Sequence, residues 1–301
     1  MKTISKFYNN KKVLVTGGAG FIGSHIVEEL VKIGAKVKVL DDLSSGNINN
    51  LKNVFSHINL IYGNVINPFT CFNATKDVQI VFHLAALVSV SNSTKNPKLC
   101  KKINVIGTKN LLEGCIKNNV KTFILSSSAA VYGNRNEICV ETDNTNPLSP
   151  YAQSKLDSEK LCIQSHKNYG LNTAALRYFN VYGNRQDPNG EYAAVIAKFT
   201  HNLKNKKPLF IFGDGKQTRD FIHISKVVQA NLKIATYNNL KGEIFNIASG
   251  KSINLFELIK QLEKNVNAKK IDLIFKSKRP GDIQNSIANC EKYKKFIQAI
   301  N

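Results

Sequence analysis

The sequence has few cysteines and no pattern among them. The six cysteines stand at positions 71, 100, 115, 139, 162 and 290, and no two form a Cys-x-x-Cys pair. Zinc sites and thioredoxin-like redox motifs use such pairs, so neither is predicted, and no metal site is expected. A chain of 301 residues can bury a sizeable core without disulfides, and we expect a reduced, cytoplasmic protein.

Long apolar runs are missing as well. The first residues, MKTISKFYNNKKVLVTGG, lack an apolar core of signal-peptide length. The stretch VQIVFHLAALVSVSNST is interrupted by His83 and several serines, so it predicts a buried strand and a loop. We therefore expect no membrane partner.

Acidic residues are scarce relative to basic ones. The chain has 42 Lys and Arg against 21 Asp and Glu, which gives a formal net charge of +21. Such an excess can indicate nucleic-acid binding, but these lysines are spread along the chain without a basic block or an arginine-rich helix. We expect instead a lysine-rich surface that favours solubility and attracts an anionic substrate, and no nucleic-acid partner.

Short apolar runs alternate with amphipathic stretches through the first half of the chain. KVLVTG, KVKVLDD, INLIYGN, IVFHLAA and KTFILSSS predict five buried strands, and TAALRYFNVYG and GEIFNIAS predict two more. This alternation predicts an α/β fold, a Rossmann-type doubly wound parallel sheet. We expect residues 1–180 and 221–248 to form this domain. Residues 181–220 and 249–301 are expected to form a smaller C-terminal α/β lobe.

The segment VLVTGGAGFIGSH follows the first strand and opens a helix. Gly17, Gly20 and Gly23 permit a tight turn and let backbone N–H groups approach a pyrophosphate at the helix N-terminus. Asp41 ends the second strand, where its carboxylate can accept hydrogen bonds from adenosine ribose hydroxyls and would repel a 2′-phosphate. The pattern predicts NAD as the cofactor. The structural alternative is a tight strand–helix turn followed by a surface aspartate.

Tyr-x-x-x-Lys occurs three times, at residues 8–12, 151–155 and 237–241. The first copy lies in what reads as a polar N-terminal tail, and the third at the end of a helix and a turn. In the second copy, Ser149 can cap a helix and Pro150 suits its first turn. Tyr151 and Lys155 would then share one helical face.

The fifth strand ends in three serines, at residues 126–128. The carboxyl ends of parallel strands line the ligand crevice, so we expect all three to point there, toward the predicted tyrosine and lysine. The structural alternative is a serine-rich turn beside a solvated helix start.

Eight segments of the chain occur in the following order: TGGAGFIGSH, DDLSSG, HLAA, SSSAAVYG, SPYAQSK, RYFNVYG, DGKQTRDF and RPGDI. Through these segments the sequence resembles the extended short-chain dehydrogenase/reductase family, specifically its NAD-dependent UDP-sugar 4-epimerases of the UDP-glucose/UDP-N-acetylglucosamine type. The resemblance covers nearly the whole chain. It implies that the sheet domain binds NAD and the smaller lobe binds a UDP-sugar. It also implies a homodimer formed by the helix that carries Tyr151 and the helix before it.

The resemblance assigns roles to individual residues. The implied catalytic residues are Ser128, Tyr151 and Lys155. The implied NAD-binding residues are Gly17, Gly20, Phe21, Ile22, Gly23, Asp41, Asp42, Leu43, Ser44, Ser45, Gly46, Asn64, Val65, Leu84, Ala85, Ala86, Asn104, Ser126, Tyr151, Lys155 and Phe179. The implied substrate-binding residues are Ser128, Tyr151, Asn180, Ala194, Val195, Arg219, Arg279, Asp282 and Ser286. Two positions depart from the family pattern: Asn64 replaces a common Asp, and Ala197 a common Pro.

The implied mechanism is a transient oxidation at sugar C4. Tyr151, as a phenolate, would remove the proton of the 4-hydroxyl, and hydride would pass from C4 to NAD⁺ and return to the other face of a 4-keto sugar. Lys155 and the nicotinamide charge are expected to lower the pKa of the phenol. Ala129 and Ala130 stand where related 4,6-dehydratases carry Asp-Glu, which disfavours dehydration. None of the family segments contains the cysteine nucleophile of an oxidation to a uronic acid.

The choice of sugar depends on the position four residues after Asp282. Relatives with a large Tyr there exclude an N-acetyl group, so Ser286 predicts interconversion of UDP-GlcNAc and UDP-GalNAc, with UDP-Glc and UDP-Gal as further substrates. The alternatives are a UDP-glucuronate-type 4-epimerase and a non-catalytic NAD-binding regulator on the same fold. A regulator of that kind typically lacks the Tyr/Lys pair, which this chain has.

Overall fold

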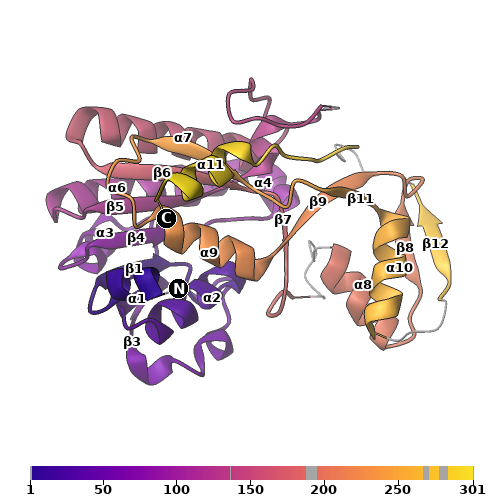
Figure 1. Cartoon of the computed structure of the whole chain (residues 1–301), viewed down its shortest axis with the longest axis horizontal. Helices are drawn as coiled ribbons and strands as arrows, with labels where there is room; N and C mark the ends of the chain where they lie inside the picture. The colour runs from indigo at the N-terminus through magenta and orange to yellow at the C-terminus, as the bar shows by residue number, and fades with distance from the viewer. Residues whose placement is uncertain (1, 136, 188–194, 267–270, 278–283, 301) are drawn as a thin grey trace.

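The computed structural model describes residues 2–135, 137–187, 195–266, 271–277 and 284–300. Seven parallel strands form a central sheet in the order β10-β6-β5-β4-β1-β2-β3 (Figure 1). The strands are β1 (Lys12–Thr16), β2 (Lys36–Asp41), β3 (Ile58–Tyr62), β4 (Ile80–His83), β5 (Thr122–Ser128), β6 (Asn172–Tyr178) and β10 (Glu243–Ile247). The order runs outward in both directions from the centre, which confirms the predicted doubly wound Rossmann-type sheet.

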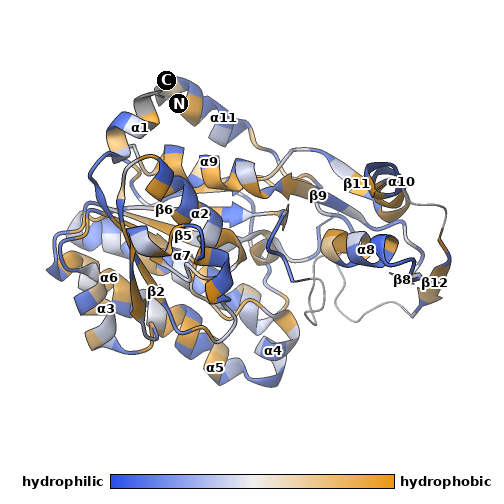
Figure 2. Ribbon diagram, turned by 90° about the horizontal axis from the view of Figure 1, so that it is seen from below, coloured by the Kyte–Doolittle hydropathy of each residue, from blue (hydrophilic) through white to orange (hydrophobic). Residues whose placement is uncertain are grey.

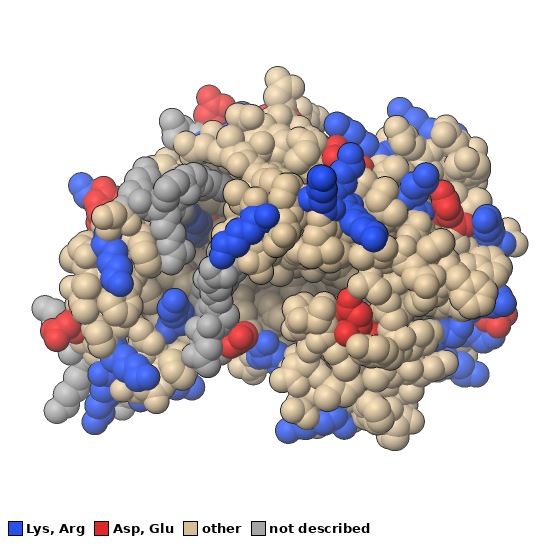
Figure 3. All heavy atoms as spheres, turned by 180° about the vertical axis from the view of Figure 1, so that it is seen from behind, with Lys and Arg blue, Asp and Glu red and all other residues tan. Residues whose placement is uncertain are grey.

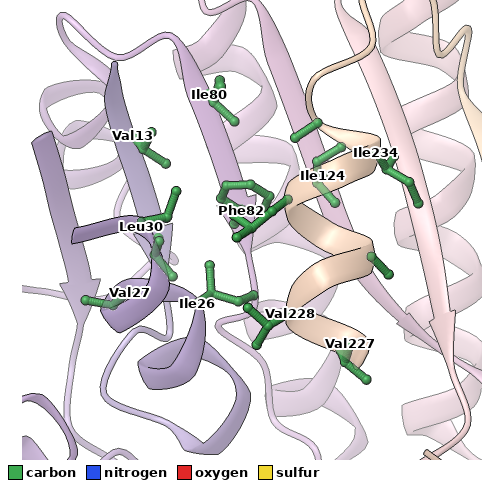
Figure 4. Close-up of a cluster of buried hydrophobic side chains, with 14 of the residues drawn as sticks. Val13, Ile26, Val27, Leu30, Ile80, Phe82, Ile124, Val227, Val228 and Ile234 are labelled. Atoms are coloured by element: carbon green, nitrogen blue, oxygen red, sulfur yellow. The ribbon is translucent and has the colours of Figure 1, made fainter. Parts of the chain in front are cut away.

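Helices cover both faces of this sheet. One face carries α1 (Lys2–Tyr8), α2 (Phe21–Lys32), α9 (Ile224–Ile234) and α11 (Glu291–Ile300), and the other α3 (Pro68–Thr75), α6 (Gly107–Lys117) and α7 (Pro150–Tyr169). Successive strand residues alternate between the faces: Val13 and Val15 pack against the first group and Leu14 against the second. In Figure 4, Ile26 of α2 and Val228 of α9 point toward Phe82 of β4. The sheet is therefore buried on both sides, as the apolar strands in Figure 2 also show.

A smaller part of the molecule lies beyond the sheet (Figure 1). It contains a three-stranded sheet of β7 (Asn180–Tyr182), β9 (Thr218–His223) and β11 (Ser252–Asn254), and a parallel pair of β8 (Leu209–Phe212) and β12 (Leu273–Lys276). Helices α8 (Val195–Lys204) and α10 (Leu255–Val266) pack together over a separate apolar core. The remaining short helices are η1 (Ile48–Leu51), η2 (Phe55–His57), α4 (Val90–Lys95), α5 (Pro97–Lys101), η3 (Lys102–Ile106) and η4 (Ala129–Tyr132).

The C-terminal helix lies with the larger core. Phe296 of α11 packs against Tyr237 and Phe245, with ring centroids 4.9 Å apart in both cases. The residues expected for the smaller lobe thus include a helix whose contacts are with β10 of the main sheet. The division into two lobes stays a prediction.

Three local expectations are wrong. Strand β3 is only partly buried, because it is the edge strand and has one neighbour. TAALRYFNVYG forms two strands, β6 and β7, because the chain leaves the central sheet at Phe179 and joins the three-stranded sheet. Tyr8 is fully buried, and its hydroxyl donates to the carbonyl oxygen of Leu232 at 2.8 Å. Its segment is therefore a packed helix, not a polar tail.

Among the residues that the structure describes, no helix is both long and apolar enough to cross a membrane.

Candidate active site

The glycine loop between β1 and α2 has no room for side chains. A Cβ on Gly23 would lie 2.1 Å from the carbonyl oxygen of Gly17. Gly17 has a φ of +67°, and a Cβ there would lie 2.6 Å from the backbone nitrogen of Ala85. Phe21 and Ile22 follow as the first residues of α2. The loop is thus a cradle of backbone at a helix N-terminus, which fits the pyrophosphate of a dinucleotide.

Asp41 is buried at the end of β2 and holds this loop. Its carboxylate accepts hydrogen bonds from the backbone N–H groups of Ala19 at 2.8 Å and Leu43 at 2.9 Å. Burial raises its pKa above the usual range, and these two hydrogen bonds partly oppose the rise. The carboxylate therefore shapes the loop. Its expected hydrogen bonds with the ribose hydroxyls of the cofactor stay a prediction.

Asp42 and Asn64 extend this region. The side-chain amide of Asn64 donates to Asp42 at 2.6 Å, and its oxygen accepts from the N–H of Ile66 at 2.9 Å. Asp42 also accepts from the backbone N–H and hydroxyl of Ser44. Asn64, expected among the NAD-binding residues, thus joins Asp42 to the backbone at Ile66.

Helix α7 begins as the sequence predicts. Ser149 accepts a hydrogen bond from the N–H of Ala152 at 3.1 Å, and Pro150 is the first helical residue. Tyr151 and Lys155 follow on one face, with the Lys155 ammonium 5.9 Å from the centroid of the Tyr151 ring. The second copy of Tyr-x-x-x-Lys is therefore the one at the sheet edge that holds the glycine loop.

Ser128 completes a group of three with Tyr151 and Lys155. Its hydroxyl lies close enough to the Tyr151 phenol to lower the pKa of that group, and its oxygen accepts the N–H of Ala130 at 3.2 Å. The Lys155 ammonium donates to the carbonyl oxygen of Ser126 at 2.7 Å. A hydroxyl, a phenol and an ammonium thus converge at the carboxyl end of β5.

The expected common direction of the three serines is wrong for Ser127. Its hydroxyl donates to the buried carboxylate of Glu159 at 2.5 Å, whereas the Ser126 hydroxyl lies near Tyr178 and lowers the pKa of that phenol. Successive side chains of a strand point to opposite faces, so Ser127 points to the other face of the sheet from Ser126 and Ser128.

The protein's own groups together raise the pKa of Tyr151. Burial contributes most to the rise, the Ser128 hydroxyl partly opposes it, and Cys100 adds to it. The direction is therefore opposite to the lowered pKa expected for this phenol. Lys155 is itself buried, and burial lowers its pKa to about 8.

This lowered pKa gives a testable pH dependence. The Lys155 ammonium is charged at pH 7 and loses its proton as the pH rises through about 8. If activity requires the charged form, kcat/KM for a UDP-sugar should fall above about pH 8. A pH profile that stays flat to about pH 10, the usual pKa of a free lysine, would contradict this prediction.

Asn104 lies in η3, a turn of π-helix, and is buried. Its amide donates to the hydroxyl of Ser154 at 2.8 Å and to the carbonyl oxygen of Leu87 at 3.1 Å, and its oxygen accepts the N–H of Leu87 at 2.8 Å. It therefore ties the loop that follows residues 84–86 to the catalytic helix.

The predicted substrate residues on β7 and β9 are held by backbone contacts. The amide of Asn180 donates to the carbonyl oxygen of Asp220 at 3.0 Å, and Arg219 donates to that of Thr218 at 2.9 Å. The N–H of Thr218 in turn donates to the carbonyl oxygen of Gln284 at 2.9 Å. These strands thus lie beside the segment that leads to Ser286.

Ser286 is partly buried, and Val195 is the first residue of α8. Ala194, Arg279 and Asp282 lie outside the described residues. Figure 3 shows the surface hollowed between the larger and the smaller part, with Lys and Arg side chains spread over this whole face.

Sequence reasoning missed four buried groups near the site: His83, Glu159, Arg177 and Asp220. His83 bonds to Thr16 at 2.7 Å, and burial, with Lys155 nearby, lowers its pKa to about 3. The signal for Glu159 was its position, four residues after Lys155 on the same helical face.

Asp220 joins three segments of the substrate side. Its carboxylate accepts from the N–H groups of Ser249 at 2.8 Å, Gly250 at 3.0 Å and Ala288 at 3.3 Å. The last contact fixes the chain two residues after Ser286. Asp220 lies in the segment DGKQTRDF, but its partners are distant in sequence, so no spacing revealed them.

Comparison with known proteins agrees with this geometry. The model of the NAD dependent epimerase/dehydratase family matches residues 13–248. The chain belongs to this family. NAD is accordingly its cofactor, and the cradle and Asp41 fit that group. Among the described residues, no group of three or more His, Cys, Asp or Glu could hold a metal ion.

The chain is similar to several members of this family, two of which have solved structures. A UDP-N-acetylglucosamine 4-epimerase from Methanobrevibacter ruminantium, in complex with UDP-N-acetylmuramic acid, is 40% identical with a TM-score of 0.90, over 95% of this chain and 92% of its own. A UDP-glucose 4-epimerase from Thermotoga maritima with UDP-glucose is 38% identical with a TM-score of 0.89, over 94% and 91%. The UDP-glucose 4-epimerase of Halalkalibacterium halodurans is 35% identical over 93% of this chain and 87% of its own. The prediction of an NAD-dependent UDP-sugar 4-epimerase, an isomerase, is confirmed at this level.

Proposed function

We propose that this family member interconverts UDP-GlcNAc and UDP-GalNAc, and also accepts UDP-Glc and UDP-Gal, with Ser128, Tyr151 and Lys155 as its catalytic residues. The observation that carries the proposal is the convergence of Ser128, Tyr151 and the buried Lys155 at the carboxyl end of β5, where Lys155 donates to Ser126 at 2.7 Å, at the same edge of the sheet as the glycine cradle.

The chain's own residues would move the proton of the sugar 4-hydroxyl. Bound NAD supplies the hydride acceptor and donor for oxidation at C4 and reduction of the 4-keto sugar. Tyr151, as a phenolate, would take up the hydroxyl proton and later return it, and Ser128 would hold the 4-oxygen with its own hydroxyl. The positive charge of an oxidised nicotinamide would lower the pKa of the phenol, which the protein alone raises.

The choice of sugar depends on Ser286. Its small side chain would leave room for an N-acetyl group, whereas a tyrosine would fill that space. We expect NMR of the anomeric signals to show conversion of UDP-GlcNAc to UDP-GalNAc by the wild type. In Ser286→Tyr, UDP-GlcNAc turnover should fall by at least about tenfold relative to UDP-Glc turnover, the size of a steric discrimination of 1–3 kcal/mol.

Ser286→Ala is the matched control, because it removes the same serine hydroxyl without adding bulk. This control should leave the ratio of UDP-GlcNAc turnover to UDP-Glc turnover unchanged. Conversion of UDP-Glc alone by the wild type would keep the mechanism and overturn the role of Ser286. Turnover of UDP-glucuronate, but of neither hexose, would favour the uronate-type epimerase.

We also retain the homodimer as a proposal. Helix α5 and η3, which both pack against α7, expose Leu99 by 44% and Ile106 by 40%, which supplies apolar surface for a second copy. The expected cytoplasmic location stays a prediction.

A further inference from the structure

The face of α7 that carries Tyr151 and Lys155 continues to Glu159. This glutamate is 1% exposed, and three donors surround its carboxylate. The Nε of Arg177 donates at 2.9 Å, its Nη2 at 2.8 Å, and the hydroxyl of Ser127 at 2.5 Å. Arg177 belongs to β6 and Ser127 to β5, so one carboxylate joins the catalytic helix to two strands of the sheet.

The same arginine reaches the other side of Ser128. Its guanidinium lies 4.7 Å from the ring centroid of Tyr132, the last residue of η4, which follows Ser128 directly. The Tyr132 hydroxyl donates to Asn246 at 2.6 Å. Ser128 thus stands between Ser127 and η4, and both are held by the Glu159–Arg177 pair.

We propose that Glu159 and Arg177 are positioning residues, which set the distance between Ser128 on β5 and Tyr151 on α7. The inference rests on the proposed roles of Ser128 and Tyr151. It goes beyond them because it assigns a role in the reaction to residues that touch neither substrate nor cofactor.

The chemistry of burial supports this role. Apolar side chains of the same volume stabilise a core as well as a buried ion pair does, or better, because ions lose their hydration. What the pair adds is fixed geometry, since a guanidinium and a carboxylate meet through two parallel hydrogen bonds. Proton transfer needs such geometry, because a displacement of about 1 Å can reduce a rate by about 100-fold.

Glu159 also acts on the charge of Lys155. The groups that face this ammonium are Tyr151 and Glu159 on its own helix, Cys100 on α5 and His83 on β4. Of these, Cys100 and, after it, the Glu159 carboxylate hold the pKa of Lys155 up against the effect of burial. A positioning pair should therefore influence both the rate and the pH profile.

Ser127→Ala is the mildest test, because it removes one hydrogen bond to Glu159 and leaves the ion pair. Thr173→Val is its matched control: Thr173 is also buried, and its hydroxyl donates at 2.8 Å to the carbonyl oxygen of Cys162, farther along α7. We expect Ser127→Ala to lower kcat by about tenfold with KM within about twofold, and Thr173→Val to leave kcat within about twofold. Equal kcat in the two variants would overturn the proposal.

Glu159→Gln adds a readout that a purely structural role would not move. Loss of the carboxylate lowers the pKa of Lys155, so the alkaline limb of kcat/KM should shift to lower pH than in the wild type. An unshifted limb in a folded Glu159→Gln protein contradicts the proposal. If this variant does not fold, the comparison of Ser127→Ala with Thr173→Val decides. An active Tyr151→Phe enzyme would instead overturn the proposed function, which keeps the two failures apart.

Discussion

Tyr151→Phe is expected to lower kcat for 4-epimerisation by about 1,000-fold, the scale of a lost general acid–base group. The Tyr151 phenol lies beside the Ser128 hydroxyl and is the group that would exchange the proton. Phenylalanine keeps the ring but has no proton to exchange. The substitution leaves the helix cap at Ser149 and the glycine cradle intact, so the unfolding midpoint should change little and NAD should still bind, with only the contact of the phenol hydroxyl lost. Single-turnover assays with NAD-loaded protein measure the rate, and fluorescence titration measures NAD binding.

Tyr237→Phe is the matched control, because Tyr237 belongs to another Tyr-x-x-x-Lys segment and packs against Phe296. It should retain wild-type kcat. An effect of the same size in both variants, or none in Tyr151→Phe, would show that the tyrosine was chosen wrongly.

Arg177→Met is expected to destabilise the protein by about 3–5 kcal/mol, because it leaves the buried Glu159 carboxylate without its partner. Arg177 is 2% exposed and Glu159 1%, so water cannot replace the lost hydrogen bonds. The double variant Glu159→Leu/Arg177→Met removes both charges and should recover most of this loss. Urea unfolding of the three proteins measures the free energies.

An exposed ion pair provides the comparison. Lys109 and Glu113 on α6 are 3.7 Å apart, with side chains 57% and 49% exposed. Glu113→Gln should therefore change the free energy of unfolding by less than about 0.5 kcal/mol. If Arg177→Met lowered the free energy of unfolding by no more than Glu113→Gln does, the Glu159 carboxylate would have to be hydrated in solution, which contradicts the prediction.

The part of the site that local sequence encodes could be predicted. The glycine spacing, Asp41 at a strand end, and the Ser149 and Pro150 helix start depend on residues within a few positions of each other, and the structure has all of them. The order of the apolar runs also predicted the seven strands of the sheet.

Contacts between distant segments could not be predicted in this way. Glu159 and Arg177 are 18 residues apart, and each reads alone as a charged residue of a helix or a strand. Tyr8 looked polar because its neighbours are, whereas its partner Leu232 is 224 residues away. The side-chain direction of Ser127, in contrast, could have been predicted, because successive residues of a strand point to opposite faces of the sheet.

The most direct test of the account uses a UDP-sugar with deuterium at C4, incubated with NAD-loaded protein in ordinary water. Oxidation and reduction at C4 within one closed site predict that the 4-epimer forms with its deuterium retained at C4. Epimer that carries hydrogen from water at C4, or a product that has lost water from the sugar, would contradict the account.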